Sequence, residues 1–388
     1  DAVTASKELG LTLTSRNKEK GMDVPLAGIP YHSSASYITK LVNKGYKVAI
    51  CEQVEDPRTV KGIVKREVVK IVTPGTVIDV DSLDATSNNY LLSVKHLDNK
   101  VGIAYLDITT GEFKVLEIED DKDYSKTFNE LYKIEPKEIL AEFNFYEALK
   151  DKFDDYSKKI DSKITLVNKL RDPEKFLTDY FNIVSLESFG ISEAKSAVHA
   201  AGMVLDYALS MQVEGELPME KIEYINITSF AEINSTTRRN LELTRNQREK
   251  TSYGTLLWVL DKCKTSMGTR YLKKIINNPL LEIDEIKKRQ DDLQYFIDNI
   301  LIREEIKDKL GEVYDLERLA GKIVLGNENG KDLTALKKSI ISSLEIMDFL
   351  RETSFFEGID TEILIQIRDI IEESIKEDAP FSIREGNM

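Results

Sequence analysis

The spacing of apolar residues changes twice along this 388-residue chain, which predicts three structural parts. In the first part, an apolar stripe predicts a helix that starts at Ser33 or Ser34 and runs through Lys44. The alternating run 46–51 and the valine-rich run 67–72 then predict two strands. We therefore expect a small α/β unit at the start of the chain.

The second part opens with three consecutive strand-like runs, joined by tight turns at Asp98-Asn99 and Thr110-Gly111. A helical stretch over 123–132, a short strand near 138–141 and a long apolar helix over 193–211 follow. Three antiparallel strands before alternating helices and strands predict an α/β unit with the ribonuclease-H-like order of elements. The three runs cover 90–97, 101–108 and 113–118.

Strand signals fade after about residue 225, and apolar residues recur every three or four positions over long stretches. This spacing predicts an all-α third part, with helices at 266–276, 283–298, 331–350 and 360–376. These changes of pattern also predict the domain boundaries. We place domains at 1–78, 89–224 and 225–388, with a linker at 79–88.

Composition argues against several classes of protein. No run of 18 or more apolar residues occurs, so neither a membrane span nor a membrane partner is expected. Cys51 and Cys263 lie far apart in the sequence, which argues for a reducing cytoplasm and against a disulfide scaffold. His32, His96 and His199 lack the spacing of metal ligands, so packing or surface roles are favoured for them.

The net charge of −14 would disfavour binding to nucleic acid if the charges were spread evenly. Two stretches instead carry a local excess of cations. Residues 1–70 hold 12 Lys and Arg against 8 Asp and Glu, and residues 235–289 hold 13 against 6. Because local patches decide the contacts with phosphates, the charge leaves DNA binding open.

Three motifs in the first part occur in a fixed order, joined by Asp56-Pro57 and the basic run 61–70. Together they closely resemble the mismatch-binding domain of the bacterial MutS family of DNA mismatch-repair proteins. The motifs are Ala27-Gly28-Ile29-Pro30-Tyr31-His32, Val48-Ala49-Ile50-Cys51-Glu52-Gln53 and Ile71-Val72-Thr73-Pro74-Gly75-Thr76.

The resemblance extends over the rest of the chain. Residues 105–113 resemble a signature of the MutS connector domain, and 236–243, 255–261 and 267–270 resemble the core and lever domain. The implied fold is multidomain. It has a partial α/β mismatch-binding domain, a ribonuclease-H-like α/β connector domain, and the first part of an all-α core and lever helical domain.

The resemblance also implies a function. The full-length family protein detects mispairs and small loops in double-stranded DNA, and uses ATP and Mg²⁺ to become a sliding clamp that recruits MutL. It acts as a homodimer in the cytoplasm. This portion is expected to serve as scaffold, DNA-backbone contact and partner surface, without catalytic residues, cofactor or metal of its own. The alternatives are a metal-dependent nuclease on a ribonuclease-H-like module and a MutS paralogue acting in recombination.

Two features of the family are not matched. The family reads mismatches with a Phe-x-Glu motif that would lie just before Asp1, so we expect a portion of a longer protein without its own mismatch reader. The family's ATPase needs a Gly-x-x-x-x-Gly-Lys-Ser/Thr phosphate loop. The nearest stretch, 326–332, is one residue short and has Asp332 in place of Ser or Thr, so it is interpreted as a loop between helices.

Five basic residues in the first part are candidate contacts to DNA phosphates: Arg16, Lys18, Lys65, Arg66 and Lys70. Arg16 and Lys70 occupy positions that are basic in the family. Phosphate contacts carry no sequence information, which suits a protein that scans any duplex. The alternative for each residue is an ordinary solvated surface.

Asp107 is the best candidate for catalysis, because ribonuclease-H-like nucleases bind a divalent metal through an Asp on the first strand. Metal-dependent cleavage needs several converging carboxylates, and only Glu142 and Asp179 can be nominated as partners. An Asp before a Thr-Thr-Gly turn is more often a turn former, and that role is favoured here.

Two further groups are expected to be structural. Tyr31 and His32 are expected to pack within a tight Gly-Ile-Pro turn rather than enter a DNA groove. Intramolecular salt bridges and hydrogen bonds are expected for Arg238, Arg239, Arg245 and Arg248.

Overall fold

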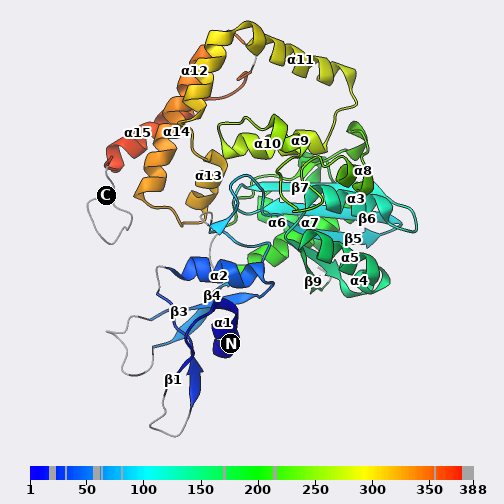
Figure 1. The fold of residues 1–388 in the computed structure, drawn as a ribbon, viewed down its shortest axis with the longest axis vertical. Helices are drawn as coiled ribbons and strands as arrows, with labels where there is room; N and C mark the ends of the chain where they lie inside the picture. The colour runs from blue at the N-terminus through cyan, green and yellow to red at the C-terminus, as the bar shows by residue number, and fades with distance from the viewer. Residues whose placement is uncertain are drawn as a thin grey trace.

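The computed structural model describes residues 1–16, 23–30, 33–55, 62, 64–79, 82–168, 172–212, 216–353 and 355–377. Its elements group into three units. We refer to the described residues of 1–79 as the N-terminal unit, of 82–88 as the linker, of 89–224 as the central unit and of 225–377 as the helical unit. In Figure 1 the N-terminal unit lies at the lower end, the central unit at the right, and the helices after α10 (Ser266–Asn277) arch over the upper left.

The N-terminal unit contains two helices and two separate antiparallel ribbons, β1 with β2 and β3 with β4. The predicted helix and both predicted strands are found. The helix ends at Asn43, and the turn that follows it contains Gly45, whose φ of 83° would be strained for a residue with a side chain. The hydrophobic core of the N-terminal unit is small and is built on Val42, Val72 and Val77. The elements are α1 (Ala2–Leu9), β1 (Thr14–Arg16), β2 (Val24–Leu26), α2 (Ser34–Asn43), β3 (Val48–Gln53) and β4 (Arg66–Val72).

The central unit is built on a six-stranded sheet with the order β10-β7-β6-β5-β8-β9. Strands β5, β6 and β7 are antiparallel, as predicted, while β8 lies parallel to β5, β9 parallel to β8, and β10 parallel to β7. The strands are β5 (Leu91–Leu97), β6 (Lys100–Asp107), β7 (Glu112–Glu119), β8 (Glu138–Glu142), β9 (Lys163–Val167) and β10 (Glu223–Tyr224).

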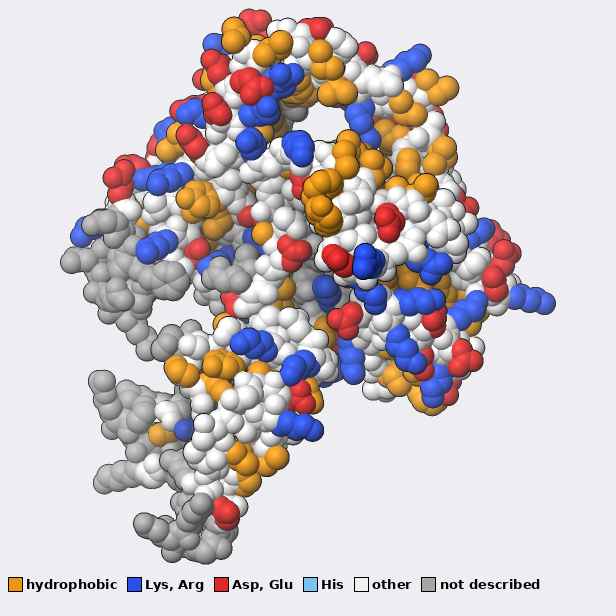
Figure 2. Space-filling view, in the orientation of Figure 1, with side chains coloured by type: hydrophobic (Ala, Val, Ile, Leu, Met, Phe, Trp, Pro, Cys, Tyr) orange, Lys and Arg blue, Asp and Glu red, His pale blue; other side chains and the backbone are white. Residues whose placement is uncertain are grey.

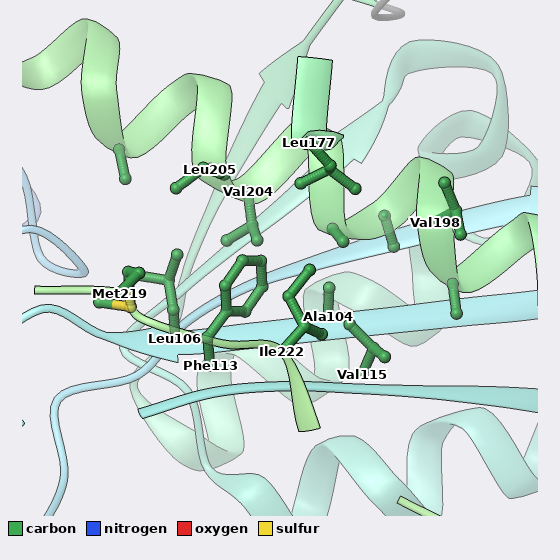
Figure 3. Close-up of a cluster of buried hydrophobic side chains, with 14 of the residues drawn as sticks. Ala104, Leu106, Phe113, Val115, Leu177, Val198, Val204, Leu205, Met219 and Ile222 are labelled. Carbon is green, nitrogen blue, oxygen red and sulfur yellow. The ribbon is translucent and has the colours of Figure 1, made fainter. Parts of the chain in front are cut away.

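Helices cover both faces of this sheet, so its strands are buried on each side. The long predicted helix, α7 (Lys195–Met211), crosses one face with α6 (Pro173–Phe181), and their side chains meet those of Leu106, Phe113 and Val115 (Figure 3). A Cβ on Gly102 would lie 2.0 Å from the carbonyl oxygen of Ser196, so α7 packs directly on the backbone of β6. The opposite face is covered by α3 (Ser125–Ile134), α4 (Phe143–Ala148) and α5 (Lys150–Ile160).

The helical unit contains the four long helices predicted for it, together with shorter ones that the spacing did not predict. α14 packs against α12, α13 and α15, and α10 packs against α9. No helix within the described ranges combines the length and hydropathy that crossing a bilayer requires. The elements are α8 (Ser235–Asn240), α9 (Leu256–Leu260), α10, α11 (Ile283–Asp298), α12 (Ile300–Leu310), α13 (Leu316–Val324), α14 (Gly330–Phe349) and α15 (Thr361–Ser374).

Candidate nucleic-acid interface and domain junctions

The exposed candidates for phosphate contact lie on the ribbons of the N-terminal unit. Lys65 and Arg66 stand at one end of the β3–β4 ribbon, and both are exposed. Lys65 pairs with Glu67 at 2.6 Å, but both side chains are more than half exposed, so the pair is weak and leaves the lysine available. Arg16 ends β1, although its side chain is outside the described part, and Lys18 lies wholly outside the described residues.

Lys70 lies in a different environment from the other candidates. Its backbone forms an isolated antiparallel bridge with Gln212, just after α7, and its side chain is partly buried there. Burial lowers the pKa of Lys70 to about 8, against the opposing attraction of Asp79. A partly buried lysine at a junction is a poorer phosphate contact than the exposed Lys65. Tyr31 and His32 lie outside the described residues.

The Thr-Pro-Gly-Thr turn after β4 docks on a carboxylate of the central sheet. Glu138 is fully buried at the start of β8 and accepts hydrogen bonds from Thr73 Oγ1 at 2.5 Å and Gly75 N at 3.1 Å. It also accepts from Thr165 Oγ1 at 2.6 Å and from the Tyr207 hydroxyl at 2.8 Å. Four donors satisfy this buried carboxylate, so the turn is part of a polar connection between two units.

A lysine of the N-terminal unit extends the same connection. Lys47 Nζ donates to the Tyr207 hydroxyl at 3.0 Å and lies 5.3 Å from the centre of its ring. Burial and the neighbouring Glu138 carboxylate raise the pKa of Tyr207, so the hydroxyl keeps its proton and remains a donor to Glu138. The chain of contacts therefore runs from Lys47 through Tyr207 to Glu138.

Asp107 is a turn former, as favoured from the sequence. Its fully buried carboxylate accepts hydrogen bonds from the backbone N–H and the hydroxyl of Thr109, at 2.9 and 2.7 Å. The other oxygen accepts from Asn88 Nδ2 at 2.9 Å and from the backbone N–H of Asn89 at 3.0 Å. These four bonds hold the β6–β7 turn and the end of the linker against each other.

The carboxylates nominated as metal partners of Asp107 have other surroundings. Glu142 accepts a hydrogen bond from Lys95 at 2.6 Å in a largely buried ion pair. Asp179 lies on α6. Across the described ranges, no group of three or more His, Cys, Asp or Glu side chains is placed to hold a metal ion.

Arg270 of α10 ties the helical unit to the linker. Its guanidinium donates two hydrogen bonds to the Asp315 carboxylate, at 2.6 and 2.8 Å, and one to the Glu317 carboxylate at 2.6 Å. It also donates to the carbonyl oxygen of Ala85 at 2.8 Å. Arg270 is only 2% exposed, so the two carboxylates compensate the cost of burying its charge.

Arg318 of α13 also binds the linker, through other backbone oxygens than Arg270 does. Its Nη2 donates to the carbonyl oxygens of Asp84 at 3.0 Å and Ser87 at 2.8 Å. On the same helix, a Cβ at Gly321 would lie 2.3 Å from the carbonyl oxygen of Thr109, so α13 packs directly on the β6–β7 turn. Linker, central unit and helical unit therefore meet at one place.

Two of the four arginines expected to bond within the protein do so. Arg238 donates to the side-chain and backbone oxygens of Asn277, and Arg245 lies 3.9 Å from the Glu135 carboxylate. The other two are exposed and form no ion pair with a described residue. They are Arg239 and Arg248.

Comparison with known proteins matches each unit to a model of one protein family. Residues 1–81 match MutS domain I, residues 89–223 match MutS domain II, and residues 236–388 match MutS domain III. The chain belongs to the MutS family. The family's ATPase domain is not among these matches. The order I, II, III along the chain agrees with the order of motifs in the sequence.

Individual MutS proteins are similar to the chain over its whole length. The DNA mismatch repair protein MutS of Fusobacterium nucleatum is 50% identical over 100% of this chain and 44% of its own length. The MutS proteins of Lachnoclostridium phytofermentans and Methanosarcina barkeri are 41% and 37% identical, again over 100% of this chain, and over 42% and 45% of their own lengths. The chain thus spans less than half the length of these curated relatives.

Residues 326–329 of the glycine-containing stretch connect α13 and α14 in MutS domain III, as predicted, whereas 330–332 form the first turn of α14. Asn329 caps α14 by accepting the backbone N–H groups of Lys331 and Asp332, while Asp332 accepts the N–H of Asn329. Asp332 also pairs with Lys322 at 2.7 Å. The segment is therefore a capping box at a helix N-terminus.

The residues that connect the MutS domains were not among the sequence candidates. Glu138 precedes the apolar run Ile139-Leu140-Ala141, and a charged residue within a buried strand was an available signal. Arg270 belongs to the stretch 267–270 that resembled the family. For Arg318 no sequence signal stood out, because its partners are backbone carbonyl oxygens.

Proposed function

We propose that this chain is part of a MutS protein that detects mispairs and small loops in double-stranded DNA. The observation that carries the proposal is the match of MutS domains I, II and III, in that order, over nearly the whole chain. In the whole protein, we propose, ATP and Mg²⁺ drive formation of a sliding clamp by a cytoplasmic homodimer that recruits MutL. This portion supplies the scaffold, contacts to the DNA backbone and a partner surface.

The central unit serves as a ribonuclease-H-like connector without nuclease activity. Its strand order supports the assignment, since β7-β6-β5-β8-β9 has three antiparallel strands followed by two parallel ones. The four hydrogen bonds to Asp107 support a structural role over a metal-dependent nuclease. The connector covers 89–224 in this proposal, between a partial mismatch-binding domain at 1–78, a linker at 79–88 and the core and lever domain at 225–388.

The DNA contacts come from the ribbons of the N-terminal unit. Lys65 and Arg66 are the best supported, because both are exposed at one end of the β3–β4 ribbon. Arg16 and Lys18 belong to the same proposal on the sequence resemblance. Lys70 has less support, because its partial burial limits its reach.

DNA binding by residues 1–388 tests this proposal. Fluorescence anisotropy with a matched and a G·T duplex should give equal affinities that fall as salt rises, with a Kd of roughly 10⁻⁴ to 10⁻⁶ M. The double variant Lys65→Glu/Arg66→Glu should weaken binding to both duplexes, because it reverses two exposed charges.

Lys264→Glu is the matched control, since it reverses an exposed charge on the helical unit. Equal losses in the control and in the double variant would refute the ribbon as the interface. A tenfold preference for the G·T duplex, about 1.4 kcal/mol, would show that the chain contains a mismatch reader.

A further inference from the structure

A second cationic site lies away from the ribbons, between the central and helical units. A cavity of about 500 Å³ is bordered by Tyr132 of α3, the end of α5, helix α8 and the loop 244–250. Figure 2 shows Lys and Arg side chains gathered around the place that α5 occupies in Figure 1. The charged residues that line the cavity are Lys159, Arg238, Arg239, Arg245 and Lys250, with Glu135 as the acidic one.

Arg238 shows that the cavity is more than a group of surface charges. Its side chain is 8% exposed, and its two terminal nitrogens donate to Asn277. Its Nε has no hydrogen-bond partner among the described residues. Because Asn277 is neutral, no carboxylate pairs with this guanidinium within the described ranges, and its charge adds to the positive potential of the cavity.

The acidic residue of the lining does not neutralise these cations. Glu135 is bound by Lys273 at 3.1 Å, and it lies 3.9 Å from Arg245. Lys159 pairs with Asp155 at 2.6 Å, but both side chains are about half exposed. Within the described ranges, neither Arg239 nor Lys250 forms an ion pair, so positive charge remains in excess in a concave site. Such a site concentrates anions.

We propose that this cavity binds phosphate groups, with Arg239 and Lys250 as the exposed contacts and the buried charge of Arg238 adding to the positive potential. Several cations around one small space suit a ligand that carries several negative charges, and the planar guanidinium suits phosphate oxygens. A free polyphosphate and the backbone of a single nucleic-acid strand present the same chemistry. The proposal is independent of the DNA contacts assigned to the ribbons, because it concerns different residues.

The test is titration calorimetry of residues 1–388 with sodium tripolyphosphate, and fluorescence anisotropy with a labelled 12-nucleotide single strand. Saturable binding of tripolyphosphate with one site per chain is the expected result. If tripolyphosphate also displaces the labelled strand, the site accepts a nucleic-acid backbone. If the strand does not bind, the site is one for small polyphosphates. Absence of saturable binding in both titrations would overturn the proposal.

Variants locate the binding. Arg239→Glu and Lys250→Glu should each weaken tripolyphosphate binding about tenfold or more, and both residues are exposed, so the fold should persist. Arg248→Glu is the matched control, because Arg248 is exposed on the same loop and does not line the cavity. Equal weakening by Arg248→Glu would show a general charge effect and reject the site. Thermal unfolding of each variant confirms that it is folded.

Discussion

Tyr207 donates its hydroxyl to the Glu138 carboxylate at 2.8 Å, at the place where the N-terminal and central units of this MutS chain meet. The tyrosine comes from α7 and the carboxylate from β8, while the other donors to Glu138 include the turn after β4. A carboxylate is stable at zero exposure only when its oxygens are fully hydrogen-bonded. The junction therefore depends on every donor being present.

Substitutions at this junction should lower the free energy of unfolding strongly, even where they remove only one polar atom. Tyr207→Phe removes one hydroxyl and should lower the free energy of unfolding by about 1–3 kcal/mol, since a charged acceptor loses a donor. Glu138→Ala leaves the donors of Thr73, Gly75 and Thr165 without an acceptor, and should lower the free energy of unfolding by on the order of 3 kcal/mol or more. Urea unfolding measures both. Tyr224→Phe, at an exposed tyrosine, is the control, and an equal effect there would argue against the junction.

Lys70 should make stability depend on pH in the alkaline range. Its pKa is about 8 in the folded protein, below the ordinary value of 10.5. Below pH 8 the folded and the unfolded protein both carry the proton on Lys70, so folding must bury a charged ammonium group. Between pH 8 and 10.5 the unfolded state still binds the proton while the folded state has lost it, so stability rises with pH.

Lys70→Met should remove this penalty. The variant should be more stable than the wild type at pH 7, by on the order of 1–3 kcal/mol, and the difference should shrink as pH rises from 8 to 10.5. Urea midpoints across that range measure it. Lys65→Met, at an exposed lysine, provides the comparison. A constant difference between wild type and Lys70→Met would contradict the lowered pKa.

Asp107 should respond to substitution as a turn former and not as a metal ligand. Asp107→Asn keeps one acceptor oxygen but turns an amide NH2 group toward two of the four donors, so it should cost about 1–3 kcal/mol, whereas Asp107→Ala leaves all four donors unpaired and should cost about 3 kcal/mol or more. Millimolar Mg²⁺ or Mn²⁺ should leave the Tm of the wild type unchanged. A Mn²⁺-dependent rise in Tm that Asp107→Asn abolishes would instead support the nuclease.

The sequence predicted elements where the pattern is local and regular. The three antiparallel strands were predicted with their turns, and Asp98 and Asn99 have the positive φ angles, 49° and 63°, that a tight hairpin turn requires. Helix α7 was predicted because apolar residues recur along the whole of its 17 residues. By contrast, α6 was missed although Asp172 caps it and Pro173 starts it, a readable pair of signals.

The junctions could not be predicted, because their partners come from distant parts of the chain. Lys70 looks like any basic residue in a strand, and the sequence gives no sign of its backbone bridge to Gln212, which follows α7. Glu138 stands out in the sequence only as a charge beside an apolar run, and its role becomes clear once Thr73, Thr165 and Tyr207 are placed around it. Long-range packing decides these environments, whereas local spacing decides the elements.

The contact between α13 and the β6–β7 turn gives the last prediction. In an open helix, Gly321→Ala would stabilise by up to about 1 kcal/mol, because alanine is the better helix former. Here the added Cβ would lie 2.3 Å from the Thr109 carbonyl oxygen, so α13 must move away from the turn. We expect a net loss of about 1–3 kcal/mol, with the sign opposite to helix propensity.

Hydrogen exchange distinguishes this loss from a general weakening of the fold. Arg318→Met removes the donor to Asp84 and Ser87 without adding bulk, so it should loosen the same contact from the other side. Both variants should speed amide exchange within 84–89, whereas Arg368→Met, at a half-buried arginine of α15 that pairs with its neighbour Asp369, should not. If the linker amides keep their wild-type exchange in both variants, α13 does not hold the linker in place. If the linker amides exchange faster in both variants, an added methyl group and a lost hydrogen-bond donor have had the same effect on one segment. The three MutS domains are then coupled through the linker.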